Sequence, residues 1–180
     1  MKNPRKLSEK IIVSNWFRQT IEKKFELNDW KVLDFLINSQ VWTNKSTIIL
    51  PITTKWKIIY LKEYRYWVEK YIINFPMWAL EKWITINKNA KNELNEETGY
   101  DTNNLKFVWK SMVSNYDSTL VTMYVANNCS KIAEQDLSEW EKITVFRTSI
   151  NKFEEMILDW KVDCPLTISC FYMAKAKGII

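Results

Sequence analysis

The chain has 180 residues, of which 47% are hydrophobic and 26% charged, and its formal net charge is +5 at pH 7. This length and composition are typical of one ordinary globular domain with enough material to bury a core. No apolar run approaches the ~20 residues that span a bilayer, and no apolar segment follows the basic N-terminus. These features exclude a membrane helix and a secretory signal, and we therefore predict a cytoplasmic protein with no membrane partner.

Residue types that serve chemistry are scarce. The chain has no histidine, which excludes an imidazole base, a Ser-His or Cys-His pair and a histidine-ligated metal. Its two glycines, Gly99 and Gly178, are too few for a phosphate-binding loop. The three cysteines lack metal-type spacing and are expected to be free thiols in a reducing compartment. We accordingly predict no metal, no cofactor and no enzymatic activity.

Tryptophan is the residue in excess, with ten copies. The remaining composition, rich in Lys, Asn and Ile, is typical of an A/T-rich gene, whereas tryptophan normally needs a G-rich codon. One hypothesis is a genetic code in which a usual stop codon also specifies tryptophan. The other is that the aromatic side chains are retained for stacking or for an interface.

The central predicted element is a helix over residues 53–75. Its aromatic and aliphatic residues fall on one broad arc when wound at 100° per residue, and its charged residues fall on the other. Thr53 or Thr54 is a suitable N-cap, and Pro76 ends the helix. An arc this wide predicts that other helices pack on two sides of it.

The flanking segments show similar three- and four-residue spacing. We predict a helix over residues 6–26, a short one from Asn28, and an extended connection or short strand over 39–52, which is rich in β-branched residues. A further helix is predicted from Pro76 to about Asn95, followed by a flexible loop over residues 95–104 that is rich in acids and contains a glycine.

The C-terminal half continues this pattern. Residues 104–134 are predicted as one long helix or two short ones, and residues 136–160 as a helix that begins with a capping-box-like Asp136. The tail after Pro165 fits a short helix or a strand. The predicted fold is therefore all-α, a single domain over residues 1–180 with six or seven helices and at most a minor strand pair.

Two pairs of acids have helical spacing, Glu155 with Asp159 and Glu22 with Glu26. Such pairs can hold a divalent cation, but here lysines flank them, and we interpret them as solvated side chains rather than as a metal site. Cys164 precedes Pro165, where a helix N-terminus would lower its pKa; a structural role is the favoured interpretation.

A mixture of basic and aromatic residues is the best candidate for a binding surface. Residues 1–91 carry 17 Lys/Arg against 8 Asp/Glu, and residues 92–180 carry 9 against 13. Single-stranded nucleic acid would suit such a surface, because bases stack on rings and phosphates pair with cations. The competing interpretation is that the lysines only solvate the face opposite a buried arc. The candidate nucleic-acid-binding residues are Lys55, Lys57, Lys62, Arg65, Tyr66 and Lys70. The candidate protein-interface residues are Ile59, Tyr66 and Ile73.

From the aromatic excess and the missing catalytic residues, we predict a non-catalytic protein-interaction or assembly subunit, of a virus or mobile element, that binds a protein partner or associates with itself. The alternative is a nucleic-acid-binding protein that uses the basic N-terminal half. The third hypothesis is a carboxylate-dependent enzyme.

Overall fold

The computed structural model describes residues 3–27 and 30–180. Strands make up 51% of the chain and helices 19%, so the predicted all-α fold is wrong. The elements in chain order are β1 (Arg5–Ser14), β2 (Arg18–Glu26), β3 (Val32–Gln40), β4 (Lys45–Thr53), β5 (Lys57–Arg65), β6 (Lys70–Asn74), β7 (Met77–Ala79), α1 (Ile86–Thr98), β8 (Tyr100–Asp101), β9 (Asn104–Ser114), β10 (Asp117–Lys131), β11 (Ile143–Ser149), α2 (Ile150–Leu158) and α3 (Pro165–Ala176).

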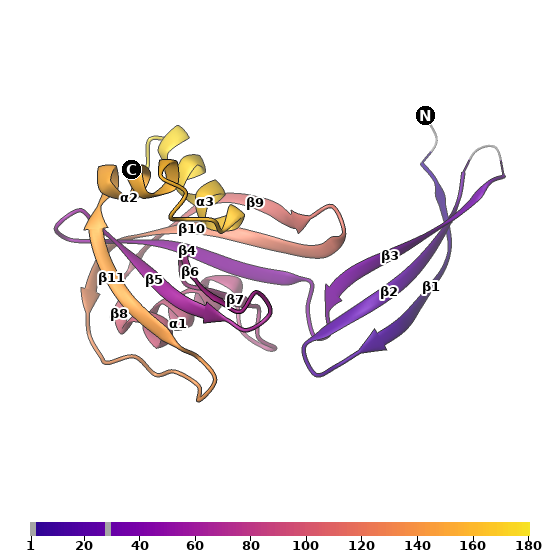
Figure 1. Cartoon of the computed structure of the whole chain (residues 1–180), viewed down its shortest axis with the longest axis horizontal. Helices are drawn as coiled ribbons and strands as arrows, with labels where there is room; N and C mark the ends of the chain where they lie inside the picture. Colours follow the sequence, from indigo (N-terminus) through magenta and orange to yellow (C-terminus); the bar gives the residue numbers. More distant parts are fainter. Residues whose placement is uncertain (1–2, 28–29) are drawn as a thin grey trace.

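Strands β1, β2 and β3 form an antiparallel arm that extends away from the rest of the molecule (Figure 1). The predicted helix over residues 6–26 is two of these strands. The turn between them is fixed by Asn15, whose side-chain oxygen accepts hydrogen bonds from the backbone N–H groups of Phe17 and Arg18. Ile21 and Phe25 are four residues apart, a spacing that fits one face of a strand as well as one face of a helix.

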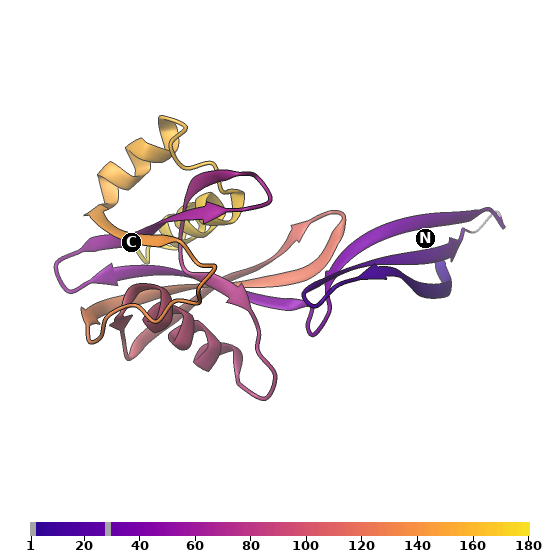
Figure 2. The ribbon, with the colours of Figure 1, turned by 60° about the horizontal axis from the view of Figure 1, so that its bottom comes forward.

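The body is a mixed sheet centred on β10, which pairs in parallel with β4 and antiparallel with β9. Every residue of β4 from Ser46 to Ile52 is buried, because helices cover both faces of the sheet (Figure 2). Along β4, Ile48 and Leu50 pack with α2 and α3, whereas Ile49 packs with α1 on the opposite face. The core is therefore two apolar layers, one on each side of β4.

The predicted helix over residues 53–75 is a β-meander, composed of the end of β4, then β5 and β6. In the middle of β5, Leu61 and Glu63 are buried while Lys62 between them is exposed. The β-branched and aromatic residues of this segment favour β-strands. They are so frequent along the sequence that many of them also fall on one arc of a helical wheel. Likewise, residues 104–134 form the β9–β10 hairpin rather than helices.

The helices that exist are shorter than predicted. Helix α1 begins later than the predicted 76–95 helix and continues to Thr98, so residues 95–98 of the expected loop are helical; β8 and the start of β9 take up most of the remainder. Helix α2 occupies only part of the predicted 136–160 helix, and the tail after Pro165 forms helix α3 rather than a strand. None of the described helices has the length and apolarity that crossing a bilayer demands.

Candidate active site around helix α1

Three glutamates share one side of helix α1. The helix begins after Thr85, whose hydroxyl accepts a hydrogen bond from the backbone N–H of Lys88, and ends at Gly99 in the left-handed conformation. Glu93, Glu96 and Glu97 are three and four residues apart, which brings their carboxylates to neighbouring positions on the helix. Glu93 and Glu97 are buried and Glu96 is partly exposed.

The acids of α1 are surrounded by further acids from distant parts of the chain. Burial, together with the charges of Glu96, Glu81 and Glu141, raises the pKa of Glu93 from 4.5 to about 9. Glu81 lies in the segment before α1, and Glu141 in the segment before β11. The folded chain thus collects carboxylates that repel one another, an arrangement found more often at functional sites than elsewhere.

Glu96 belongs to the same group. Burial and the charges of Glu81, Asp136 and Glu141 raise the pKa of this carboxyl. The segment that carries Asp136 is bound directly to the end of the helix, because the backbone N–H of Asp136 donates to the carbonyl of Glu96 (2.9 Å). The Gln135 amide donates to the carbonyl of Glu97 (2.7 Å).

Glu97 faces the sheet. Its pKa is raised well above 4.5 by burial and by the charges of Glu93 and Glu63, and the Arg65 guanidinium opposes this rise. The backbone N–H of Met77, in β7, donates to the Glu97 carboxylate (3.2 Å). This contact ties the helix to the strand that follows β6.

Strand β5 contributes a buried ion pair close to the acids of α1. The Arg65 guanidinium lies 2.7 Å from the carboxylate of Glu63, and the Asn74 amide donates to the same carboxylate (2.7 Å). Burial raises the pKa of Glu63, while Arg65 and Asn74 lower it. Arg65 is therefore the cation that β5 places among these carboxylates.

Asn89 holds the segment before α1 in place. Its side-chain oxygen accepts a hydrogen bond from the backbone N–H of Glu81 (2.9 Å), and its amide donates to the hydroxyl of Thr47 in β4 (3.3 Å). Asn89 is completely buried. One polar side chain thus fixes Glu81 relative to both the helix and the sheet.

Whether these acids suit a divalent cation depends on their donor chemistry. Over residues 3–27 and 30–180, no three acidic or thiol side chains converge closely enough to form a complete metal site. Mg²⁺, however, is commonly held by one or two carboxylates together with substrate phosphates and water, rather than by a full protein cage. The all-oxygen donors and their mutual repulsion, which a cation would relieve, fit such an ion.

A cavity of about 370 Å³ is separated from the acids by residues that contact them. Arg65 and Met77, which contact Glu63 and Glu97, also line it. Its other walls come from the arm, from β6 and β7, and from the start of α3. It contains three cationic side chains, Arg18, Arg65 and Lys70. The glutamates themselves do not line this cavity, but its cationic walls suit an anionic ligand.

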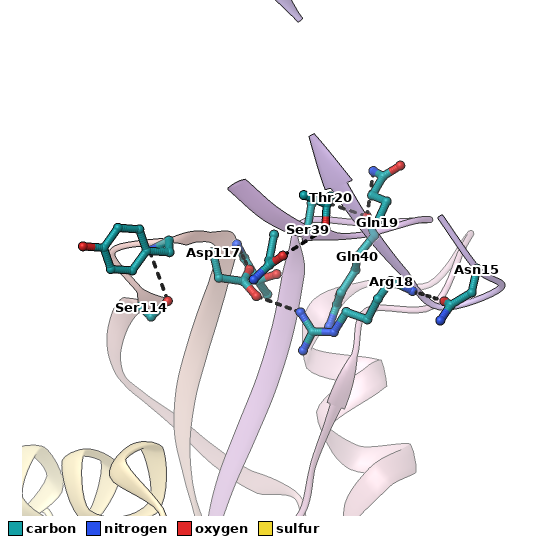
Figure 3. A network of polar contacts seen from close by, with 11 residues as sticks. Asn15, Arg18, Gln19, Thr20, Ser39, Gln40, Ser114 and Asp117 are labelled. Atoms are coloured by element: carbon teal, nitrogen blue, oxygen red, sulfur yellow. Dashed lines mark hydrogen bonds and ion pairs between the residues drawn. The ribbon is translucent and has the colours of Figure 1, made fainter. Parts of the chain in front are cut away.

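The arm meets the body through a network of polar contacts (Figure 3), which includes Arg18 from the wall of this cavity. The Arg18 guanidinium lies 2.7 Å from the carboxylate of Asp117, the first residue of β10. The backbone N–H of Asn38, in β3, donates to the carbonyl of Tyr116 (2.8 Å). Arg18 is therefore positioned at once by its own strand and by the central strand of the body.

The predicted nucleic-acid-binding residues do not form one surface. Lys57 begins β5 and Lys55 precedes it, whereas Arg65 ends the strand and Tyr66 and Lys70 follow it. The two ends are roughly 25 Å apart for a strand of this length. Arg65 is buried in its pair with Glu63, and Lys70 pairs with Asp163. Lys62 lies between the two groups, exposed on β5.

The remaining predicted sites are dispersed. Ile59 is completely buried, so it is not available to a partner, and Ile73 packs against the core. Tyr66 is exposed, and its hydroxyl donates to the carbonyl of Trp140. The earlier carboxylate pairs lie outside the acid cluster: Glu155 and Asp159 each pair with a lysine at the surface, and Glu22 and Glu26 lie on β2. The three cysteines are free, and Cys164 precedes α3.

Sequence reasoning missed the acids of α1. Their spacing, with Gly99 shortly after Glu97, is the pattern of a helix that carries carboxylates on one side and ends at a glycine. Assigning residues 95–104 to a loop concealed that signal. Nothing in the sequence could indicate that Glu63 and Glu141 lie close to these acids.

Comparisons with known proteins bear on this site. No protein-family model matches the chain. The crystal structure of an ADP compounds hydrolase matches with a TM-score of 0.82 and 20% identity, covering 100% of this chain and 98% of that one. ADP-ribose pyrophosphatase of Bacillus subtilis (strain 168) is 30% identical over 104 residues, 57% of this chain and 56% of that protein. A methanol dehydrogenase activator of Bacillus methanolicus is 32% identical over 84 residues, 46% of this chain and 45% of that protein.

The chain spans about half the length of the curated relatives it matches. The similarities nevertheless contradict the predicted non-catalytic assembly subunit of a virus or mobile element, and its nucleic-acid-binding alternative, because two of the three relatives are named for hydrolytic reactions. The error came from equating the absence of histidine with the absence of catalysis. Carboxylates can support hydrolysis without any histidine when a metal ion acts as the Lewis acid.

Proposed function

We propose that the chain is a hydrolase that cleaves the phosphoanhydride of a compound containing ADP. The observation that carries this proposal is the acid cluster of α1 together with a cavity lined by Arg18, Arg65 and Lys70, whose wall residues Arg65 and Met77 contact Glu63 and Glu97. The names of the structural neighbour and of the B. subtilis relative support the substrate class. A diphosphate bears negative charge at neutral pH, so it needs cations around it and a metal ion to balance it.

Different residues of this chain would bind the metal ion and the substrate. One or two of the carboxylates of Glu93, Glu96 and Glu97 would hold the divalent cation, which when bound supplies charge neutralisation and an activated water. Arg65 would bind a phosphate oxygen from within the cavity, since its guanidinium keeps donors free beyond its contact with Glu63. Arg18 lies on the arm side, where it would bind the remainder of the substrate.

The reaction consumes one water. The water oxygen forms a bond to one phosphorus, the bond from that phosphorus to the bridging oxygen breaks, and the bridging oxygen leaves with the other phosphate. The proton of the water passes to a carboxylate of the cluster. Glu81 or Glu141, whose charges act on Glu93, is a second acid close enough to the cluster to take it. The products are two phosphate monoesters.

A substrate panel tests the proposal. The purified protein is incubated with Mg²⁺ and, separately, ADP-ribose, ADP, a dinucleotide with a diphosphate bridge and a simple phosphomonoester. We expect release of AMP from one or more compounds in which ADP is joined to a second group, and no turnover of the monoester. Turnover of the monoester alone, or of no compound with any divalent cation, would refute the assignment.

The compartment is part of the proposal. Cys129, Cys164 and Cys170 are all free thiols, and burial raises the pKa of Cys129 and of Cys170 to about 12, which keeps both unreactive. Free thiols are typical of a reducing compartment, and we place the enzyme in the cytoplasm.

A further inference from the structure

Four tryptophans have a backbone conformation that favours glycine. Within the described residues, eight have φ in the left-handed region: Gly99, Gly178, Asn128, Glu69 and the tryptophans Trp30, Trp56, Trp83 and Trp160, the last four at 64°, 56°, 70° and 60°. Glycine adopts this region freely and asparagine tolerates it, whereas a bulky side chain at such a position is an outlier. Half of the left-handed positions therefore carry one of the residues least suited to them.

The indole rings of these four tryptophans are exposed to solvent. Trp83 is 99% exposed and Trp160 90% exposed, and Trp30 and Trp56 are also exposed. In the part of the chain that the structure describes, none of the four makes an aromatic or cation–π contact. Tryptophan is normally well buried, so no burial of the ring offsets the cost of the backbone conformation.

The ends of α2 and α3 provide a matched comparison. At the end of α3, the N–H of Gly178 donates to the carbonyl of Lys175 (2.9 Å), and the next N–H donates to that of Ala174 (3.0 Å). At the end of α2, the N–H of Trp160 donates to the carbonyl of Ile157 (3.1 Å), and the next N–H donates to that of Met156 (2.9 Å). Both patterns are the Schellman motif, whose left-handed position is usually glycine.

The same preference for turns extends beyond these four residues. Eight of the ten tryptophans lie in turns or bends, and only Trp78 and Trp109 lie in strands. Turns of this kind are enriched in glycine, and strands are enriched in tryptophan. The distribution of tryptophan along this fold is therefore the one expected of glycine, while glycine itself occurs twice.

We infer that glycine occupies positions 30, 56, 83 and 160 in the protein made by the source organism, because the codon rendered as tryptophan is one that this organism reads as glycine. The inference replaces the hypothesis that a usual stop codon specifies tryptophan. It accounts together for the tryptophan excess, the glycine deficit and the left-handed backbone.

Glycine in place of tryptophan would also change the cavity near the acids. Trp67 and Trp78 line that cavity, and the same codon at these positions would remove both indoles from its walls. The native cavity would then be wider beside Arg65. Catalysis itself does not depend on this point, since none of the acids of α1 is affected.

Mass spectrometry of the protein purified from its source organism tests the inference directly. The tryptic peptides of residues 83–88 and 153–161 contain positions 83 and 160, and their fragment masses distinguish glycine from tryptophan. We expect glycine at both positions. Tryptophan at either position overturns the inference, whatever the activity of the protein.

A recombinant series supplies the second readout. We expect Trp160→Gly to raise the folding equilibrium constant about threefold or more, and Trp160→Ala to leave it nearly unchanged, because alanine keeps the left-handed penalty. Phe107→Gly is the control, an exposed aromatic on strand β9, where glycine should lower stability. A Trp160→Gly protein no more stable than the Trp160→Ala protein would contradict the inference.

Discussion

At the residue scale, Glu93 has an unusual environment, a carboxyl buried in a helix and surrounded by other carboxyls. Its pKa of about 9, against an ordinary 4.5, results first from burial and then from Glu96, Glu81 and Glu141. Between these two pH values the folded protein keeps a proton that the unfolded chain has released. The free energy of unfolding therefore falls as the pH rises through this window.

Replacing Glu93 with glutamine should remove that dependence. We expect Glu93→Gln to be more stable than the wild type at pH 8 to 9, by on the order of 1–3 kcal/mol, and to show no gain below pH 4.5. Thermal unfolding of both proteins across this range measures the effect. Glu134→Gln is the matched control, since the Glu134 side chain is 96% exposed. Parallel curves for wild type and Glu93→Gln would refute the environment described for Glu93.

A divalent cation should act on the same group. Mg²⁺ that binds the carboxylates favours their ionised form and the folded state, so it should raise the unfolding temperature of the wild type at pH 8. The increase should be much smaller in a Glu93→Gln, Glu96→Gln double variant. An equal increase in both proteins would place the cation elsewhere.

Arg65 illustrates the cost of an unpaired buried charge. Its partner Glu63 has a side-chain exposure of only 4%. Arg65→Met should therefore destabilise the fold by about 3–5 kcal/mol in denaturant unfolding, and adding Glu63→Gln should recover much of the loss. The exposed pair of Lys152 and Glu155 is the comparison, where Lys152→Met should change stability by under about 1 kcal/mol. No recovery in the double variant would show that Arg65 acts through packing alone.

At the scale of elements, helix α1 depends on its C-terminal glycine. Gly99 has φ of 71°, and a Cβ at this position would lie 2.1 Å from the carbonyl oxygen of Ala133. Gly178 has a similar φ of 64° but open space around it. Gly178→Ala should cost about 1 kcal/mol, whereas Gly99→Ala should cost about 2 kcal/mol or more and lower activity, because it displaces the segment behind the acids. Equal losses in chemical denaturation would contradict this account.

Some of the secondary-structure elements could be predicted from the sequence, and others could not. The extended character of residues 39–52 could be predicted from their β-branched content, whereas the residues after Pro165 fitted a helix or a strand equally. The strand β5 could not be distinguished from a helix, because the four-residue spacing of Tyr60 and Tyr64 fits one face of either structure. A scarcity of glycine ordinarily argues against hairpins, yet tryptophans such as Trp56 occupy left-handed turn positions in this fold.

The candidate site, too, could be predicted from the sequence only in part. The three acids of α1 and Gly99 are adjacent in the sequence, so their shared face could have been recognised from spacing alone. The acids that face them come from β5 and from the segments before α1 and β11. Only the pairing of β5 with β11 and the packing of α1 on the sheet bring these carboxylates together, and neither can be derived from local pattern.

At the scale of the whole molecule, the arm of β1, β2 and β3 is the least supported part. Apolar side chains on β1 and β3 are exposed, among them Ile11, Phe35 and Leu36. A small sheet with both sides in water is marginally stable alone, and exposed apolar clusters commonly mark interfaces. We therefore retain self-association as a prediction and place it on this arm.

Sedimentation measures that prediction. We expect the wild type to form a dimer, and Leu36→Lys to shift it toward the monomer. Leu158→Lys, at an exposed apolar position at the end of α2 on the body, should leave the equilibrium unchanged. A wild type that is monomeric at all accessible concentrations would remove the arm as an interface.

The central claim is that carboxylates of α1 support hydrolysis of a phosphoanhydride. The most direct measurement is the rate of AMP release from ADP-ribose in the presence of Mg²⁺ by the wild type, Glu96→Gln and Glu134→Gln. The account predicts a loss in kcat/KM of about a hundredfold or more for Glu96→Gln and a near wild-type rate for the exposed control. Equal rates for all three proteins would contradict it.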